Sequence, residues 1–170
     1  VTALCACNNT KESPVSLQWE MVKNGAAPGF YESSFTITNT STKPLESDWE
    51  IYYTQLSPRQ VKVNEDSPVI IEMINAGYYK IAPSESWTPL APGDSIKISY
   101  LNQGIFTQTL FTPKSPFFVT NNGTQISIPL SIAPFDRKEQ WTVQGRIAPS
   151  YPDGEKVYAD NQALETTYKI

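Results

Sequence analysis

The sequence predicts an all-β fold, an antiparallel β-sandwich, on three observations. Apolar and polar residues alternate with a period of two in several segments, as in strands with one buried and one wet face. Turn-forming residues separate these segments at short intervals, and the chain has 14 prolines, most of them between strand candidates. No stretch of ten residues keeps a helical period without interruption. A chain of 170 residues is long enough for one domain with a sizeable core.

The strand candidates follow one another along most of the chain. In residues 15–22, Val15, Leu17, Trp19 and Met21 alternate with polar or smaller neighbours, and residues 31–38 repeat this pattern. The further candidates are 49–55, 69–74, 78–81, 95–100, 106–111, 117–120, 125–128 and 141–147. Such a series of short strands is typical of a sandwich or barrel.

Glycine, proline and asparagine clusters predict the turns between these strands. The turn signals are Asn24-Gly25, Pro28-Gly29, residues 39–44, Ala76-Gly77, residues 92–94, residues 102–104, residues 121–123 and residues 152–154. We therefore expect one compact module over residues 15–158.

Composition excludes several classes of function. Hydrophobic residues make up 39% and charged residues 18% of the chain, which is the composition of a folded domain. The net charge of −4 would repel a phosphate backbone, so no nucleic-acid partner is expected. The chain has no histidine, which removes the usual general base and the usual zinc ligand.

The N-terminus resembles the end of a bacterial lipoprotein signal. Leu4-Cys5-Ala6-Cys7 fits a lipobox, and Cys7 would then be the lipidated residue. Residues 8–14 have the polar composition of a tether, so residues 1–14 are interpreted as a signal remnant and tether. This predicts a periplasmic or outer-membrane lipoprotein of a bacterial cell envelope, joined to the membrane only through its acyl anchor. The alternative is an ordinary apolar N-terminus or a cloning remnant.

Acidic residues offer no convincing catalytic or metal site. Glu46, Asp48 and Glu50, then Glu65 with Asp66, and Asp136 with Glu139 lie in loop-like surroundings. Carboxylates there are expected to be solvated charges. No calcium-loop spacing and no glycine-rich phosphate loop is present, so we expect no metal and no cofactor.

Aromatic residues supply the only candidates for a binding site, because sugar rings stack on aromatic rings. In residues 49–55, Trp49 and Tyr53 share one side of the predicted strand and Tyr52 lies on the other. Tyr79, whose ring must oppose that of Tyr78, and Trp87, in a loop, are further candidates. Tyr52, Tyr79 and Trp87 are thus predicted to contact glycan or a neighbouring domain. The alternative is that they pack against loops, while Trp19, Phe35, Trp49 and Trp141 form the core.

Three segments resemble the N-terminal module of bacterial chitobiases and β-N-acetylhexosaminidases. They are Asp-Trp-Glu-Ile-Tyr-Tyr at 48–53, Asn-Ala-Gly-Tyr-Tyr-Lys-Ile-Ala-Pro at 75–83 and Leu-Ala-Pro-Gly-Asp-Ser-Ile-Lys-Ile-Ser-Tyr at 90–100. The likeness extends over roughly residues 17–119, and the order of the segments is more specific than any one of them.

The resemblance implies a β-sandwich akin to carbohydrate-binding modules, with an N-acetylhexosamine-containing glycan as ligand. It also implies that the complete protein cleaves terminal N-acetylhexosamines with help from the substrate's acetamido group. In that family an adjacent Asp-Glu pair in a separate barrel catalyses the reaction, and these 170 residues contain no Asp-Glu dipeptide. The expected catalytic partner is therefore a further domain of the same polypeptide, and residues 159–170 are interpreted as a linker toward it.

Three functional hypotheses follow. The first is a non-catalytic hexosaminidase module that binds glycan or positions the catalytic barrel. The second is a stand-alone surface lipoprotein domain that binds glycan or protein. The third, a hydrolase complete in itself, is not expected. Between glycan binding and domain packing, the sequence slightly favours packing, because rings that stack on sugar also seal interdomain interfaces.

Overall fold

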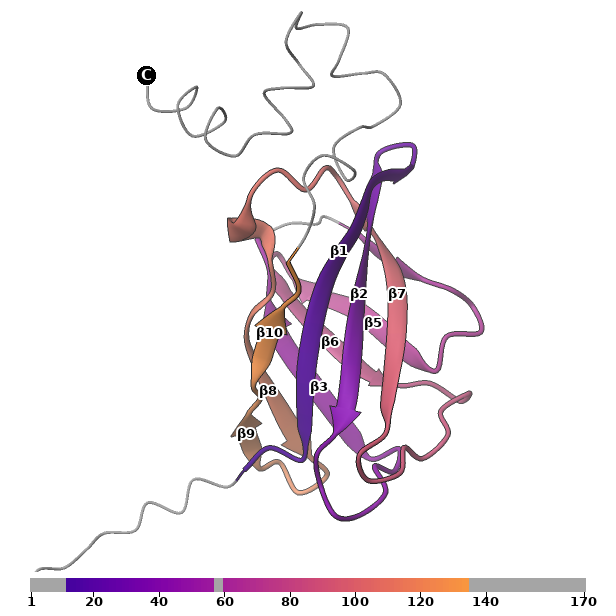
Figure 1. The fold of residues 1–170 in the computed structure, drawn as a ribbon, viewed down its shortest axis with the longest axis vertical. Coiled ribbons are helices and arrows are strands. Elements are labelled where there is room, and N and C mark those ends of the chain that lie inside the picture. Colours follow the sequence, from indigo (N-terminus) through magenta and orange to yellow (C-terminus); the bar gives the residue numbers. More distant parts are fainter. Residues whose placement is uncertain (1–11, 57–59, 135–170) are drawn as a thin grey trace, which may run out of the picture.

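The computed structural model describes residues 12–56 and 60–134, which form a β-sandwich of two five-stranded sheets (Figure 1). The first sheet has the order β10-β1-β2-β7-β4 and the second the order β5-β6-β3-β8-β9. The strands are β1 (Val15–Ala27), β2 (Phe30–Asn39), β3 (Trp49–Thr54), β4 (Val61–Val63), β5 (Val69–Asn75), β6 (Tyr78–Pro83), β7 (Ser95–Gln103), β8 (Lys114–Thr120), β9 (Gln125–Ser127) and β10 (Leu130–Ile132).

Nearly all neighbouring strands of the described residues are antiparallel. In the first sheet, β2 is central and pairs with β1 and β7, with Phe35 opposite both Trp19 and Ile98. In the second sheet, β3 is central and pairs with β6 and β8. The pairing of β10 with β1 is parallel, with Leu17 opposite Leu130. The predicted fold class is confirmed.

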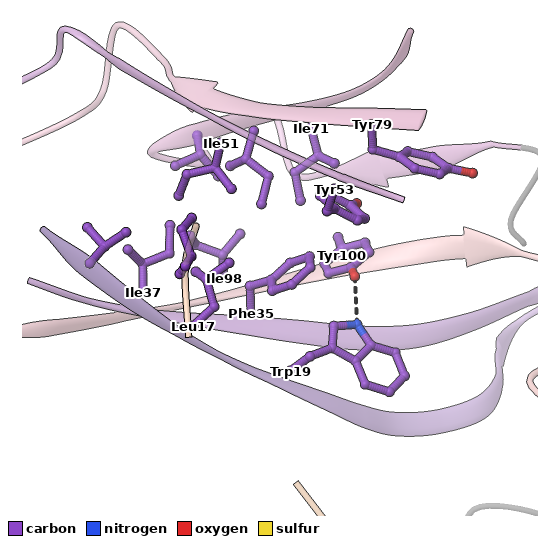
Figure 2. Close-up of a cluster of buried hydrophobic side chains, with 14 of the residues drawn as sticks. Leu17, Trp19, Phe35, Ile37, Ile51, Tyr53, Ile71, Tyr79, Ile98 and Tyr100 are labelled. Carbon is purple, nitrogen blue, oxygen red and sulfur yellow. Dashed lines mark hydrogen bonds between the residues drawn. The ribbon is translucent and has the colours of Figure 1, made fainter. Parts of the chain in front are cut away.

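The core lies between the two sheets and is built by the residues that the period of two predicted. Val15, Leu17, Trp19 and Met21 of β1 are all buried, and Trp49 is buried at the start of β3. Figure 2 shows Phe35 of the first sheet reaching toward Tyr53 of the second, whose ring centroid is 5.2 Å away.

A polar contact joins β1 and β7, two strands of the first sheet, at one end of this apolar layer. The indole Nε1 of Trp19 donates a hydrogen bond of 2.8 Å to the hydroxyl of Tyr100 (Figure 2). Both side chains are buried, so the bond satisfies polar atoms that have left water.

Two turn signals were predicted between the first two strands, and only one of them forms the turn. Asn24-Gly25 does not end the strand: β1 continues to Ala27, with shifts in its register against β2. The hairpin turns at Pro28-Gly29 instead, where proline presets φ and Gly29 adopts a φ of 77°. Asn24 is buried and clamps a distant loop, because its side chain donates to Phe106 O and accepts from Phe106 N.

The predicted strand at residues 106–111 is wrong. Phe106 lies in a loop and is buried against the rings of Trp19 and Tyr31, and the segment ends in a short 3-10 helix, η1 (Thr109–Phe111). The alternation there reflects a buried anchor in a loop rather than strand pairing. Strands β4 and β10, of three residues each, were not predicted, because such short segments show little period. β9 is equally short but lies within the predicted segment 125–128. The predicted strand at 141–147 lies outside the described residues.

Candidate functional site

The outer face of the second sheet carries a row of three aromatic rings, which we call the aromatic strip. It consists of Tyr78 on β6, Tyr52 on β3 and Phe117 on β8, all half-buried. The ring of Tyr52 lies 5.5 Å from that of Tyr78, with an angle of 17° between their planes. It lies 5.4 Å from that of Phe117, with an angle of 13°. Near-parallel rings at this spacing are offset-stacked, so the strip is one continuous apolar surface running across three strands.

A β-bulge in β8 helps to place Phe117 in the strip. Tyr52 is opposite Phe117, but Thr54 is opposite Lys114, so two residues of β8, Ser115 and Pro116, oppose one residue of β3. Ser115 has a φ of 49°. The bulge falls where Pro116 has no N–H to donate to a regular ladder. Because the extra residue changes the alternation, Lys114 and Phe117 both lie on the outer face.

Charged side chains border the strip and are joined in one network. The hydroxyl of Tyr52 donates a 2.7 Å hydrogen bond to Oε2 of Glu50. Nζ of Lys80 lies 3.5 Å from Oε1 of Glu50 and 3.7 Å from Oε2 of Glu72. These ion pairs are partly exposed and contribute little stability, but they orient the two carboxylates beside the rings.

This network raises the pKa of the Tyr52 phenol. Its hydrogen bond to the Glu50 carboxylate, with burial and the negative charge of Glu50, raises the pKa of Tyr52 to about 12. The hydroxyl is therefore protonated at neutral pH and stays a hydrogen-bond donor.

A groove of about 490 Å³ adjoins the strip at Glu50. Its lining includes the outward residues Ala82 and Val119 and the loop residues Asp48 and Asn121. Nδ2 of Asn121 donates a 2.8 Å hydrogen bond to Oδ2 of Asp48, which ties the segment before β3 to the segment after β8. The strip and groove together offer apolar ring surface next to hydrogen-bonding groups, the combination that a sugar ring requires.

Of the three residues predicted for a binding site, Tyr52 alone belongs to this surface. Tyr79 is fully buried, stacks on Tyr53 with their centroids 5.2 Å apart, and lies between the sheets (Figure 2). Burial raises the pKa of Tyr79 to about 12. The expectation that Tyr79 contacts a ligand or a neighbouring domain is therefore corrected.

The expectation that Trp87 contacts a ligand or a neighbouring domain is also corrected. Its side chain is buried, packs edge-on against Trp49 at 5.1 Å, and donates through Nε1 to the carbonyl oxygen of Leu45. A loop position suggested exposure, but Trp87 closes one end of the core. Of the predicted core residues, Trp19, Phe35 and Trp49 are buried as expected, and Trp141 lies outside the described residues.

Tyr78 and Phe117 were not among the predicted site residues. Each is one of two consecutive aromatic residues, Tyr78-Tyr79 and Phe117-Phe118, and in a strand such a pair must place one ring on each face. That signal predicts an outward ring in both segments. Which ring faces outward, and that both flank Tyr52, depends on strand pairing.

The acidic residues that were predicted to be solvated loop charges are exposed where the structure describes them, except Glu50, which is half-buried in β3 and contacts Tyr52 and Lys80. Glu46, Asp48, Glu65 and Asp66 are exposed, whereas Asp136, Glu139 and Cys7 lie outside the described residues. Within residues 12–56 and 60–134, no group of three or more metal-ligating His, Cys, Asp or Glu side chains occurs. No helix in this described part is long and apolar enough to cross a membrane.

Residues 16–144 match the CHB_HEX family model, described as "Putative carbohydrate binding domain". The chain belongs to this family. The resemblance seen in the sequence is thereby confirmed, and the outer face of the second sheet is the candidate site of a carbohydrate-binding domain. No curated protein matches the chain.

Solved structures support the fold of this CHB_HEX domain. An exo-β-N-acetylglucosaminidase of family GH20 from Vibrio harveyi, in complex with N-acetylglucosamine, is similar with a TM-score of 0.53 and 12% identity over 72% of this chain. A family GH18 chitinase from Chromobacterium violaceum is similar with a TM-score of 0.53 and 14% identity over 78% of this chain. The chain corresponds to 19% and 21% of the lengths of these two proteins.

Proposed function

We propose that this CHB_HEX domain is a non-catalytic glycan-binding module whose ligand lies along the aromatic strip. The observation that carries the proposal is the row Tyr78–Tyr52–Phe117, stacked on an open sheet face and bordered by the carboxylates of Glu50 and Glu72. The rings would pack against the apolar C–H faces of sugar rings. The carboxylates would accept hydrogen bonds from sugar hydroxyl groups.

An N-acetylhexosamine-containing glycan is the proposed ligand. The GH20 structure contains N-acetylglucosamine, and another similar structure is a chitinase. An acetamido group adds a methyl group and an amide to the sugar, which suit an apolar strip with polar borders.

The test is to titrate the full chain with oligomers of N-acetylglucosamine and to compare it with Tyr52→Ala. Because Tyr52 is the central ring, its loss separates the other two, and we expect affinity to fall at least about tenfold, or about 1.4 kcal/mol. Tyr52→Phe, which keeps the ring and removes the bond to Glu50, should retain most of the binding.

Phe30→Ala is the matched control, because Phe30 is a half-buried aromatic residue of the other sheet, covered by Lys62 Nζ at 4.6 Å from its ring centroid. It should leave affinity unchanged. Equal effects of Tyr52→Ala and Phe30→Ala, or no binding by the wild-type chain, would refute the proposal.

We also propose that the parent polypeptide is a β-N-acetylhexosaminidase in which this domain accompanies a catalytic barrel. The proposal is supported by the family match and by the GH20 structure, of which this chain covers 19%. Reading the gene downstream of Ile170 tests it, since a catalytic domain with an adjacent Asp-Glu pair is expected there. A stop codon at that point would instead favour a stand-alone lipoprotein domain.

Attachment to a bacterial cell envelope through Cys7 is the remaining proposal, and it rests on the lipobox-like segment alone. Metabolic labelling of the full-length protein with a fatty-acid probe tests it. Label should be incorporated into the natural protein and lost in Cys7→Ser.

A further inference from the structure

The loop between β7 and β8 presents two large apolar side chains to solvent. Ile105 is 58% exposed and Leu110, in η1, is 54% exposed, although Phe106 between them is completely buried. Residues 98–113 contain no Asp, Glu, Lys or Arg. A third apolar side chain, that of Leu56, follows β3 at the same end of the sandwich and is 69% exposed. We call the surface formed by Leu56, Ile105 and Leu110 the apolar end.

Hydrogen bonds hold the backbone beneath this surface in place. Gln55, the neighbour of Leu56, donates through Nε2 to the carbonyl oxygen of Phe111 at 2.7 Å. Asn24 both donates to and accepts from the backbone of Phe106. The rings of Phe106 and Phe111 lie 6.5 Å apart, which joins the two parts of the loop. The exposed side chains are therefore displayed by a fixed backbone, which reduces the entropy lost when a partner binds.

The chain leaves β10 beside the apolar end. The backbone nitrogen of Ala133 donates a hydrogen bond of 2.8 Å to the carbonyl oxygen of Trp19. The ring of Trp19 lies 5.5 Å from that of Phe106, in the loop that forms the apolar end. Figure 1 shows η1, the loop before it and the end of β10 at one end of the sandwich. The residues that follow Pro134 therefore start next to this surface.

The segment 141–147 has the pattern of a strand with one apolar face. Apolar residues occupy alternate positions and polar residues lie between them, Trp141, Val143 and Ile147 against Thr142, Gln144 and Arg146. The family match extends to residue 144 and so includes most of this segment. From Pro134, the extended chain up to Trp141 can span about 23 Å, more than the distance of about 10 Å between two packed sheets. The segment can therefore reach the apolar end.

We propose that the apolar end is the docking surface for residues 141–147 of the same chain, with Trp141 packed on Ile105 and Leu110. Packing there removes apolar area of both partners from water, and the described loop has no charge to be desolvated. The contact uses no residue of the aromatic strip, so it is independent of glycan binding there. It fixes the direction in which the polypeptide leaves the sandwich and thereby orients the residues that follow.

A double-mutant cycle on the full chain tests the contact between Ile105 and Trp141. If the two side chains touch, Ile105→Ala should change the unfolding equilibrium constant at least about threefold less in a Trp141→Ala background than in the wild-type chain. Ile70→Ala is the matched control, because Ile70 is an isoleucine of β5 that is 47% exposed and lies outside the apolar end. Its effect should be the same in both backgrounds.

Acrylamide quenching of tryptophan fluorescence is a second measurement, which does not depend on the stability of an alanine variant. Trp19, Trp49 and Trp87 are buried, so an exposed Trp141 would dominate the quenching. Leu110→Arg changes an exposed position, and it should displace Trp141 and raise the quenching constant. The rise should be absent when Trp141→Phe is also present.

The outcomes decide between a docked segment and the other possible partners of this surface. Coupling of Trp141 to Ile105 but not to Ile70, with quenching that rises in Leu110→Arg only when Trp141 is present, supports the proposal. Equal effects of Ile105→Ala in both backgrounds, or quenching unchanged by Leu110→Arg, overturns it. A dimer that Leu110→Arg dissociates, measured by light scattering, also overturns it, because a second copy would then cover the apolar end. Glycan binding and its loss in Tyr52→Ala are measured separately, so the proposed function stands or fails on its own.

Discussion

Replacing Tyr100 by phenylalanine tests the buried hydrogen bond between Trp19 of β1 and Tyr100 of β7. The change removes the hydroxyl oxygen that accepts a hydrogen bond of 2.8 Å from Nε1 of Trp19. Both side chains are almost completely buried. The ring itself would remain stacked on Phe35, from which its centroid lies 5.5 Å away with 8° between the planes. The variant therefore loses a hydrogen bond without leaving a large cavity.

The expected loss of stability depends on the Trp19 N–H, which has no acceptor after the substitution. Because Trp19 is buried, its N–H cannot form a hydrogen bond to water after the substitution. The variant is therefore destabilised by the desolvation of an unpaired donor. That cost is about 1–3 kcal/mol, against about 1 kcal/mol for an ordinary hydrogen bond exchanged with water. We expect the free energy of unfolding of Tyr100→Phe to fall by about 2 kcal/mol.

Tyr53→Phe is the matched control. Its hydroxyl is buried and affects the pKa of Tyr100, but it has no hydrogen-bond partner of ordinary geometry among the described residues. Removing it should change stability by less than about 0.5 kcal/mol or raise it, because a buried polar atom without a partner is itself a cost.

Urea unfolding of the full chain, followed by tryptophan fluorescence, measures both variants. Tyr100→Phe should lower the midpoint with an unchanged denaturant dependence, which identifies a change of stability alone. Equal midpoints for Tyr100→Phe and Tyr53→Phe would refute the reasoning, because they would show that the bond from Trp19 has no special energetic role.

Three further predictions concern the site and the buried tyrosines. Glu50→Gln should lower the pKa of Tyr52 from about 12 toward 10, measured by NMR titration of the phenol carbon, and an unchanged value would show that Glu50 does not set it. Burial raises the pKa of Tyr53 and Tyr100 well above 10, so the folded chain retains protons that the unfolded chain loses. The free energy of unfolding should therefore be maintained below about pH 10 and fall as the pH rises above it; urea midpoints that stay constant up to about pH 11 would contradict this. Ser115→Gly should raise stability by about 0.5 kcal/mol, because relief of the strain at a φ of 49° exceeds the entropic cost of glycine, and a lower thermal midpoint would contradict it.

Much of the fold was predictable because the alternation of apolar and polar residues along a strand indicates which face is buried. Trp19 and Trp49 were expected inside and Tyr52 outside, and the structure has them so. The same reasoning failed for Phe106, because one buried ring in a loop resembles one position of a strand. It failed for Trp87, because a loop of serines and prolines gives no sign that it folds back over the core.

Residue types and their local period were enough to predict the all-β class, the two faces of most strands, the lack of histidine chemistry and the family resemblance. The folded arrangement was needed to show that Tyr78, Tyr52 and Phe117 form one strip and that Asp48 lines the same groove as Asn121. These contacts join strands far apart in the chain, and their register depends on sheet order and on a bulge of one residue, which no local pattern specifies.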